Sequence, residues 1–238
     1  MARLLIHVEG ETEETFVNDL LADHLFDYGY EIVSARILGN ARLREKRGGI
    51  RAWSSVKKDI VNHLKEDSDC LATMMVDYYG LPQTGDRAWP GRAPAGSLPF
   101  SQKSACVENA LLADVTKDLG GEFEARRFLP FVVMHEFEGL LFSNCQAFAE
   151  AIARPQLAQQ LQNIRQQFAT PEEINDSPVT APSKRVEELV SGYEKPLFGT
   201  LAALKMGLAT IRRECPHFKE WLERLERWPQ QHGTQTTT

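Results

Sequence analysis

Several features that mark large classes of protein are missing from this sequence. It has no apolar run close to the roughly 18 residues of a membrane-spanning helix, and its first residues lead into a predicted strand instead of a signal peptide. It has neither the GxxxxGK[ST] loop nor the GxGxxG fingerprint of nucleotide-binding folds. Its four cysteines are too far apart for a CxxC metal site or a dense disulfide framework. We therefore expect a cytoplasmic protein with reduced thiols and no membrane contact.

The chain also lacks an excess of positive charge. Its 27 basic and 33 acidic residues give a net charge of −6, which does not suit a protein that coats nucleic acid through bulk charge. Positions 36–58 nevertheless contain eight Lys or Arg and a single acid, Glu45, a local charge of +7. Such a patch can meet a polyanion, although an ordinary solvated surface explains it equally well. The candidate nucleic-acid contacts within it are Arg42, Arg44, Lys46, Arg47 and Arg51.

Apolar runs alternate with amphipathic segments along the first part of the chain. The runs predict strands at 4–8, 30–38, 70–80 and within 123–142. Apolar residues at helical spacing predict helices at 12–28, 52–65 and 101–119. Alternating strands and helices indicate a parallel sheet with crossover helices.

The pattern changes after position 143, where strand signals give way to helical ones. We therefore predict an α/β fold, with a Rossmann-like, mostly parallel four-stranded sheet flanked by helices at 1–143. A helical region at 144–229 should pack on it, followed by a disordered tail at 230–238. The segment 80–100 is rich in glycine and proline and is predicted to be a long irregular loop.

Acidic residues follow several of the predicted strands. Glu9 comes directly after the first strand, where Gly10 permits a sharp turn and Thr12 is a candidate N-cap for the next helix. Because the carboxyl ends of parallel strands meet at one edge of a sheet, these acids should converge. Closely spaced carboxylates repel unless a cation neutralises them, and Mg²⁺ or Mn²⁺ suits such oxygen ligands. The candidate metal ligands are Glu9, Glu13, Asp77, Glu136 and Glu138.

Some of these acids also have a purely structural interpretation. Glu13 lies in a first helical turn, where the helix dipole stabilises an acid that has no chemical role. Glu136 and Glu138 begin a short predicted helix, where acids are common. Asp77 instead closes a buried strand, where an unpaired charge is costly, and this favours a functional role.

Two short segments that contain candidate ligands resemble motifs of a known family. "VEGETEE" (8–14) is similar to the first motif of toprim domains, the metal-dependent fold of topoisomerases, primases and OLD nucleases. "MMVDYYG" (74–80) resembles the second motif, in which toprim proteins usually carry Asp-x-Asp. Here Tyr79 takes the place of the second acid, so this motif lacks the ligand expected for a second metal ion.

A fuller match includes "VDYYGLP", "HEFEGLLFS", "APSKR" and "GYEKPLFG". Together they resemble a bacterial toprim-like group catalogued as domain of unknown function 4276. The resemblance implies a Mg²⁺- or Mn²⁺-dependent nuclease that cleaves DNA or RNA in anti-phage defence, with an ABC-type ATPase as a partner. It is also compatible with a homo-oligomer. The alternative is a non-catalytic subunit that keeps the fold and binds such an ATPase.

The resemblance also implies roles for individual residues. Glu9 matches the toprim glutamate, a metal ligand or general acid/base, and Asp77 matches the first acid of the second motif. Glu13 matches the acid one helical turn after the glutamate. OLD nucleases use a further lysine to stabilise charge in the transition state, and Lys184 and Lys195 are both candidates for it.

Overall fold

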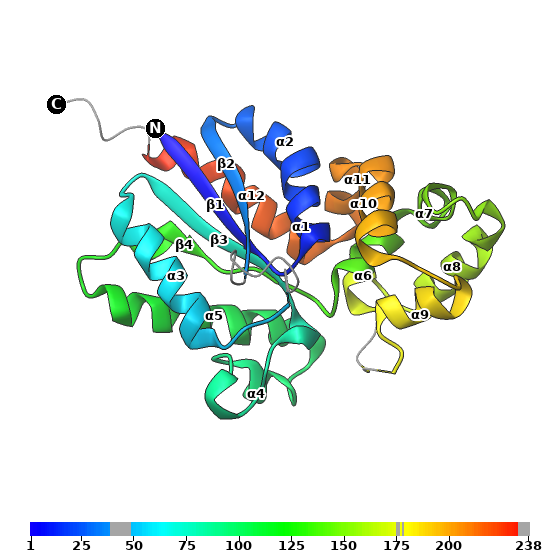
Figure 1. Ribbon diagram of the computed structural model, residues 1–238, viewed down its shortest axis with the longest axis horizontal. Coiled ribbons are helices and arrows are strands. Elements are labelled where there is room, and N and C mark those ends of the chain that lie inside the picture. The colour runs from blue at the N-terminus through cyan, green and yellow to red at the C-terminus, as the bar shows by residue number, and fades with distance from the viewer. Residues whose placement is uncertain (39–48, 175–176, 178, 233–238) are drawn as a thin grey trace.

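The computed structural model describes residues 1–38, 49–174, 177 and 179–232. Its centre is a sheet in which every pairing is parallel, with the strand order β2-β1-β3-β4 and β5 also paired to β3 (Figure 1). The strands are β1 (Ala2–Val8), β2 (Tyr30–Ile37), β3 (Cys70–Asp77), β4 (Phe128–Leu129) and β5 (Val132–Val133). The predicted α/β class with a mostly parallel sheet is confirmed.

The fourth predicted strand differs in detail, because it consists of two pieces of two residues each. Pro130 lies between them and has no N–H to donate to the ladder. The N–H of Val132 instead donates to the carboxylate of Glu108 at 2.9 Å. The sheet therefore has five strands, of which the last two are short.

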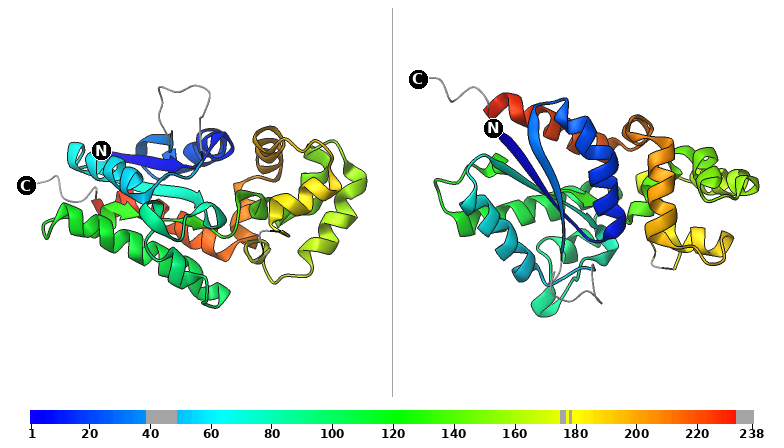
Figure 2. Two further views of the ribbon diagram at one scale, coloured as in Figure 1. Left: turned by 60° about the horizontal axis from the view of Figure 1, so that its bottom comes forward. Right: turned by 45° about the horizontal axis from the view of Figure 1, so that its top comes forward.

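Helices cover both faces of the sheet (Figures 1 and 2). One face packs against α3 (Trp53–Glu66) and α5 (Phe100–Leu119). The other packs against α12 (Pro216–His232) and the helical segment that begins as α1 (Glu11–Phe16), continues as a π-helix and ends as α2 (Ala22–Phe26). The continuous apolar run of β3 is explained by its burial between these two layers.

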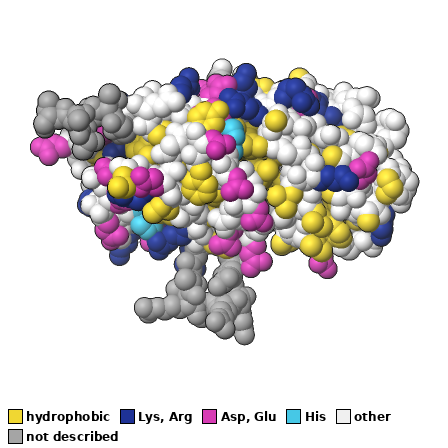
Figure 3. Space-filling view, turned by 90° about the horizontal axis from the view of Figure 1, so that it is seen from above, with side chains coloured by type: hydrophobic (Ala, Val, Ile, Leu, Met, Phe, Trp, Pro, Cys, Tyr) yellow, Lys and Arg dark blue, Asp and Glu magenta, His cyan; other side chains and the backbone are white. Residues whose placement is uncertain are grey.

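Six further helices lie mostly beyond one end of the sheet, to the right in Figure 1. They are α6 (Phe137–Leu141), α7 (Cys145–Ala151), α8 (Ala158–Arg165), α9 (Pro182–Leu189), α10 (Lys195–Met206) and α11 (Leu208–Glu214). Within the described residues, no helix has the length and apolar character needed to cross a lipid bilayer. The surface seen from above carries acidic and basic side chains interspersed (Figure 3).

The last helix returns from this region to the sheet. The indole N–H of Trp221 donates to the hydroxyl of Thr73 at 3.0 Å, and that hydroxyl donates to the carbonyl of Leu129. Tyr30 donates to the carbonyl of Leu225 at 2.9 Å, so strands β2 and β3 are both joined to α12. The domain boundary predicted at 143 stays a prediction. The last helix, α12, shares the hydrophobic core that covers one face of the sheet.

Three sequence-based expectations about local structure are corrected. The first helix is capped at Gly10, and Thr12 is buried within α1 instead of capping it. The segment 80–100 contains α4 (Arg92–Ala95) and a short 3₁₀ turn, and Arg92 holds it by donating to the carbonyl of Tyr78 at 2.9 Å. Residues 230–232 of the predicted tail belong to α12, while 233–238 lie outside the described residues.

The variant Thr73→Val tests how α12 is attached. It keeps the side-chain shape but removes the hydroxyl, so the buried indole N–H of Trp221 and the carbonyl of Leu129 lose their partner. We expect the free energy of unfolding in urea to fall by ~1–3 kcal/mol. In a Trp221→Phe background the same change should cost less, because the donor is already gone. Equal costs in both backgrounds would show that the hydroxyl does not join helix and strand.

Candidate functional site

The acids that follow the first and third strands lie against each other. Glu9 comes directly after β1 and Asp77 is the last residue of β3, its neighbour in the sheet. The backbone N–H of Asp77 donates to Oε2 of Glu9 at 3.3 Å, and Oδ1 of Asp77 accepts the N–H of Phe137 at 2.9 Å. Segments far apart in the sequence thus hold these two carboxylates at the carboxyl edge of the sheet.

The other three candidate ligands surround this pair. Glu13 bends back to accept the N–H of Gly10 at 3.0 Å, which also satisfies the start of α1. Glu136 accepts the N–H of Ser183 at 2.9 Å and thereby connects the segment after β5 to α9. Glu138, in α6, is almost fully buried. Glu13 and Glu136 therefore lie beside the site and also accept backbone hydrogen bonds that stabilise the fold around it.

The structure separates the two candidate lysines. The ammonium group of Lys195 lies 3.3 Å from a carboxylate oxygen of Glu138 and 4.0 Å from one of Glu136. Lys184 instead pairs with Glu187 on its own helix at 2.6 Å, and more than half of its side chain is exposed. Lys195 is thus the candidate that the fold brings to the acids.

A close contact between helices holds Lys195 in this place. A Cβ atom added at Gly199 of α10 would lie 3.1 Å from Cγ2 of Thr12 in α1. The absence of a side chain at position 199 therefore lets α10, which begins at Lys195, lie directly on the helix that carries Glu13.

Burial dominates the electrostatics of these acids. It raises the pKa of Asp77 well above its ordinary value, and the negative charges of Glu9 and Glu13 raise this pKa further. The pKa of Glu9 is also raised, first by burial, while its bond from Asp77 opposes the rise. Burial raises the pKa of Glu13 and that of Glu138 to about 7.

Lys195 responds in the opposite sense. Burial by itself would lower the pKa of its ammonium group, but Glu138 and Glu136 raise the pKa above its ordinary value. Lys195 is therefore held as a cation. The buried carboxylates outnumber this single paired lysine, so the cluster retains an affinity for further positive charge.

This donor set fits a hard divalent cation in its chemistry, because it consists of buried carboxylate oxygens that lack full compensation. Among the described residues, no three His, Cys, Asp or Glu side chains are arranged as a ready-made metal-binding group. Mg²⁺ is commonly held by one or two carboxylates, with water and substrate phosphate completing its coordination, so a preformed cage is not required. Within this set, Glu9 and Asp77 are the two acids that a hydrogen bond joins directly, through the N–H of Asp77.

Sequence reasoning missed Gly80, which follows the second motif. A Cβ atom at this position would lie 3.2 Å from Oε2 of Glu9 and 2.9 Å from the side chain of Ile50. Glycine is therefore needed here so that the Glu9 carboxylate can approach the turn after β3. The signal was present as the glycine that ends "VDYYG". Tyr79, in place of the expected second acid, stacks on His135 with ring centroids 5.1 Å apart.

One part of the basic stretch at 36–58 contacts the backbone of Glu9. The N–H of Gly49 donates to the carbonyl of Glu9 at 3.0 Å, and Arg51 follows two residues later. The carbonyl of Arg51 accepts the indole N–H of Trp89 at 2.9 Å, which fixes this backbone. The other four candidate contacts lie outside the described residues, namely Arg42, Arg44, Lys46 and Arg47.

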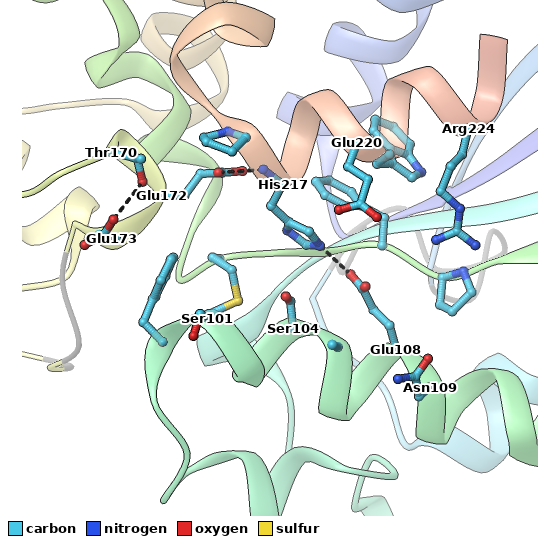
Figure 4. Close-up of a pocket in the computed structure, with 17 residues that line it drawn as sticks. Ser101, Ser104, Glu108, Asn109, Thr170, Glu172, Glu173, His217, Glu220 and Arg224 are labelled. Carbon is cyan, nitrogen blue, oxygen red and sulfur yellow. Dashed lines mark hydrogen bonds and ion pairs between the residues drawn. The ribbon is translucent and has the colours of Figure 1, made fainter. Parts of the chain in front are cut away.

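A cavity of about 500 Å³ lies apart from these acids, between α5, α12 and the segment at 170–173 (Figure 4). Its polar side chains largely serve the fold. Glu108 pairs with His217 at 3.0 Å and accepts the N–H of Val132, and Glu172 accepts two N–H groups at the start of α12. None of the five candidate ligands lines this cavity.

The raised pKa values predict how stability depends on pH. The unfolded chain loses these protons first as the pH rises, so the contribution to stability is complete below the ordinary pKa of about 4.5 and is lost as the pH rises through about 7. Without metal, the free energy of unfolding should therefore be lower at pH 8 than at pH 5 by about 2 kcal/mol or more. Urea titrations in EDTA over this range measure it.

Two variants of α1 make this measurement specific. Glu13→Gln removes one buried charge but keeps an oxygen that can accept the N–H of Gly10, so the loss of stability between pH 5 and 8 should be smaller. Glu11→Gln, an exposed acid in the same turn, is the matched control and should leave the loss unchanged. The same pH dependence in both variants would contradict the assignment.

Comparisons with known proteins found three similar solved structures and one family model. Three structures of the C-terminal region of the Xanthomonas campestris pv. campestris OLD protein are similar to this chain. Two of them, at 16% and 15% identity and TM-scores of 0.48 and 0.42, cover 98% of both chains. The third, at 16% identity and a TM-score of 0.40, covers 93% of this chain and 94% of its own. None of the curated proteins matches. A family model described as "Domain of unknown function (DUF4276)" matches residues 8–226, and the chain therefore belongs to this family.

Proposed function

We propose that this protein is a metal-dependent, toprim-like nuclease that hydrolyses phosphodiester bonds in DNA or RNA. The observation that carries the proposal is the meeting of Glu9 and Asp77, from two neighbouring strands, beside a half-buried lysine, Lys195. Burying several acids together destabilises a protein, so such a cluster is expected where a cation or a reaction requires it. The two toprim-like sequence motifs contain Glu9 and Asp77.

Each residue has a definable part in this chemistry. Bound Mg²⁺ or Mn²⁺ would supply activation of the attacking water and neutralise charge on the phosphate. Glu9 and Asp77 would hold the ion, with Glu13, Glu136 and Glu138 as further acids around it. The backbone bonds to Glu9 and Asp77 fix their orientation before substrate arrives.

Lys195 provides positive charge at the same edge of the sheet. Its ammonium group pairs with Glu138 and Glu136, yet its side chain is 40% exposed, so it can also reach a bound anion. In hydrolysis, negative charge grows on the phosphate oxygens and on the leaving oxygen. A fixed cation within a partly buried site stabilises that charge more strongly than it would in water.

The wider biological setting rests on the resemblance of the sequence motifs. It supports an effector role in anti-phage defence and an ABC-type ATPase as partner. Arg51, whose backbone lies close to Glu9, and the basic residues that precede it would then guide the nucleic acid to the acids. A homo-oligomer is compatible with this proposal.

A second candidate function is a non-catalytic subunit of such an ATPase complex. It is favoured by Tyr79, which occupies the place of the second acid of the toprim motif and stacks on His135. Under this alternative, the purified protein would not cleave nucleic acid with Mg²⁺ or Mn²⁺, either alone or together with its ATPase.

The variant Asp77→Asn tests the metal-dependent reaction. Its amide oxygen can still accept the N–H of Phe137, so the fold should persist, while the charge that holds the cation is gone. We expect cleavage of DNA or RNA with Mn²⁺ to fall by about 10²-fold or more. The same variant should be at least as stable as the wild type in EDTA, because one source of repulsion is removed. Undiminished cleavage would refute the proposal.

The two lysines provide a matched pair of variants. Lys195→Ala should lower kcat/KM by about 10²–10³-fold, because the cation beside the acids is lost. Lys184→Ala, which removes an exposed lysine paired on its own helix, should leave kcat/KM within about twofold. Circular dichroism checks that both variants are folded. Equal losses, or a larger loss in Lys184→Ala, would contradict the assignment of this role to Lys195.

A further inference from the structure

The turn before α10 carries a second polar side chain toward the acids. Tyr193 lies two residues before Lys195, and its N–H donates to the carbonyl of Val190 at 3.2 Å. Gly192, directly before it, has a φ of +75°, which favours glycine and sets the direction in which the chain enters the turn. The Tyr193 ring stacks on Phe198 with centroids 5.7 Å apart. The backbone and the ring together fix where the hydroxyl group points.

The hydroxyl group lies in the narrow space between α10, α1 and α6. A Cβ atom added at Gly199 would be 3.9 Å from this hydroxyl oxygen, 3.9 Å from Phe137 and 3.1 Å from Thr12. Thr12 is one residue before Glu13, and Phe137 lies between Glu136 and Glu138. The hydroxyl is therefore placed beside the acidic cluster, although it belongs to a different part of the chain.

This hydroxyl group is shielded from solvent and has no hydrogen-bond partner within the described parts of the chain. A buried hydroxyl without a partner costs free energy, and a phenylalanine would keep the stacking on Phe198 without that cost. Burial raises the pKa of Tyr193 well above its ordinary value, and Glu138 and Glu136 raise this pKa further. The group is thus a protonated donor without a partner, beside Glu138 and Glu136.

We propose that Tyr193 and Lys195 form a phosphate subsite, in which the Tyr193 hydroxyl donates a hydrogen bond to a non-bridging oxygen of the phosphodiester. This inference rests on the proposed nuclease function and adds Tyr193 to it as a substrate-binding residue. An anionic oxygen is the fitting partner, because Lys195, two residues further on, supplies positive charge for the same group. A hydrogen bond to a charged acceptor is also stronger than one between neutral groups.

The test compares Tyr193→Phe with Tyr30→Phe in the full-length chain. Tyr30 is a matched control, because its hydroxyl is also buried but donates to the carbonyl of Leu225 in α12 and to none of the candidate ligands. The substrate is bis(p-nitrophenyl) phosphate with Mn²⁺, which avoids a choice between DNA and RNA, and inorganic phosphate is the competing inhibitor. Mn²⁺ binding without substrate and thermal unfolding are measured on the same proteins.

Tyr193→Phe should raise KM for the diester and the inhibition constant of phosphate by about tenfold. Its Mn²⁺ affinity should be unchanged, and its melting temperature should be equal to or higher than that of the wild type. Tyr30→Phe should show the reverse pattern, with a lower melting temperature and unchanged constants for diester and phosphate.

Three results would overturn the inference. Unchanged KM and phosphate inhibition in Tyr193→Phe would exclude the subsite while leaving the nuclease function intact. Weaker Mn²⁺ binding with unchanged phosphate inhibition would assign the hydroxyl to the metal ion's water instead. A wild type that binds Mn²⁺ but neither hydrolyses the diester nor binds phosphate would contradict the nuclease function itself, and the subsite with it.

Discussion

Repulsion among buried carboxylates is the constraint on which the site depends. Asp77, Glu9, Glu13 and Glu138 are all drawn into the protein at one edge of the sheet, and burial raises the pKa of each. Such an arrangement opposes folding near neutral pH unless positive charge enters it. Lys195 supplies part of that charge. The negative charge that Lys195 does not neutralise would favour a bound cation, so the repulsion that weakens the fold is also what supports the proposed metal site.

The surrounding fold holds the acids in place against this repulsion through backbone groups. N–H groups from β3, α6 and α9 each bond one carboxylate, and the donors belong to Asp77, Phe137 and Ser183. Bonds of this kind do not depend on the identity of the side chain at the donor position. They orient the carboxylates without neutralising them, which is what a site needs if its charge is to remain available for a ligand.

The sequence was sufficient to predict what depends on local pattern. The strands that end near Glu9 and Asp77, and the convergence of parallel strands at one edge, follow from apolar runs and connection rules that act within about 30 residues. The choice between Lys184 and Lys195 did not follow, because it depends on how α10 packs against α1 through Gly199. The role of Gly80 and the bonds of Trp221 and Leu225 that join α12 to the sheet were missed for the same reason. Contacts between distant segments leave no periodic signal in a single sequence.

The return of α12 to the sheet has a consequence for how the protein is made. Trp221 joins the last helix to Thr73 in the middle strand, and Lys195 also comes late in the chain. A nascent polypeptide that has emerged only as far as position 143 would carry the acids of the sheet edge but neither this lysine nor the helix that seals the core. Domains generally fold as units during synthesis. The acids of the sheet edge therefore meet their lysine, and the core closes, only when translation is nearly finished.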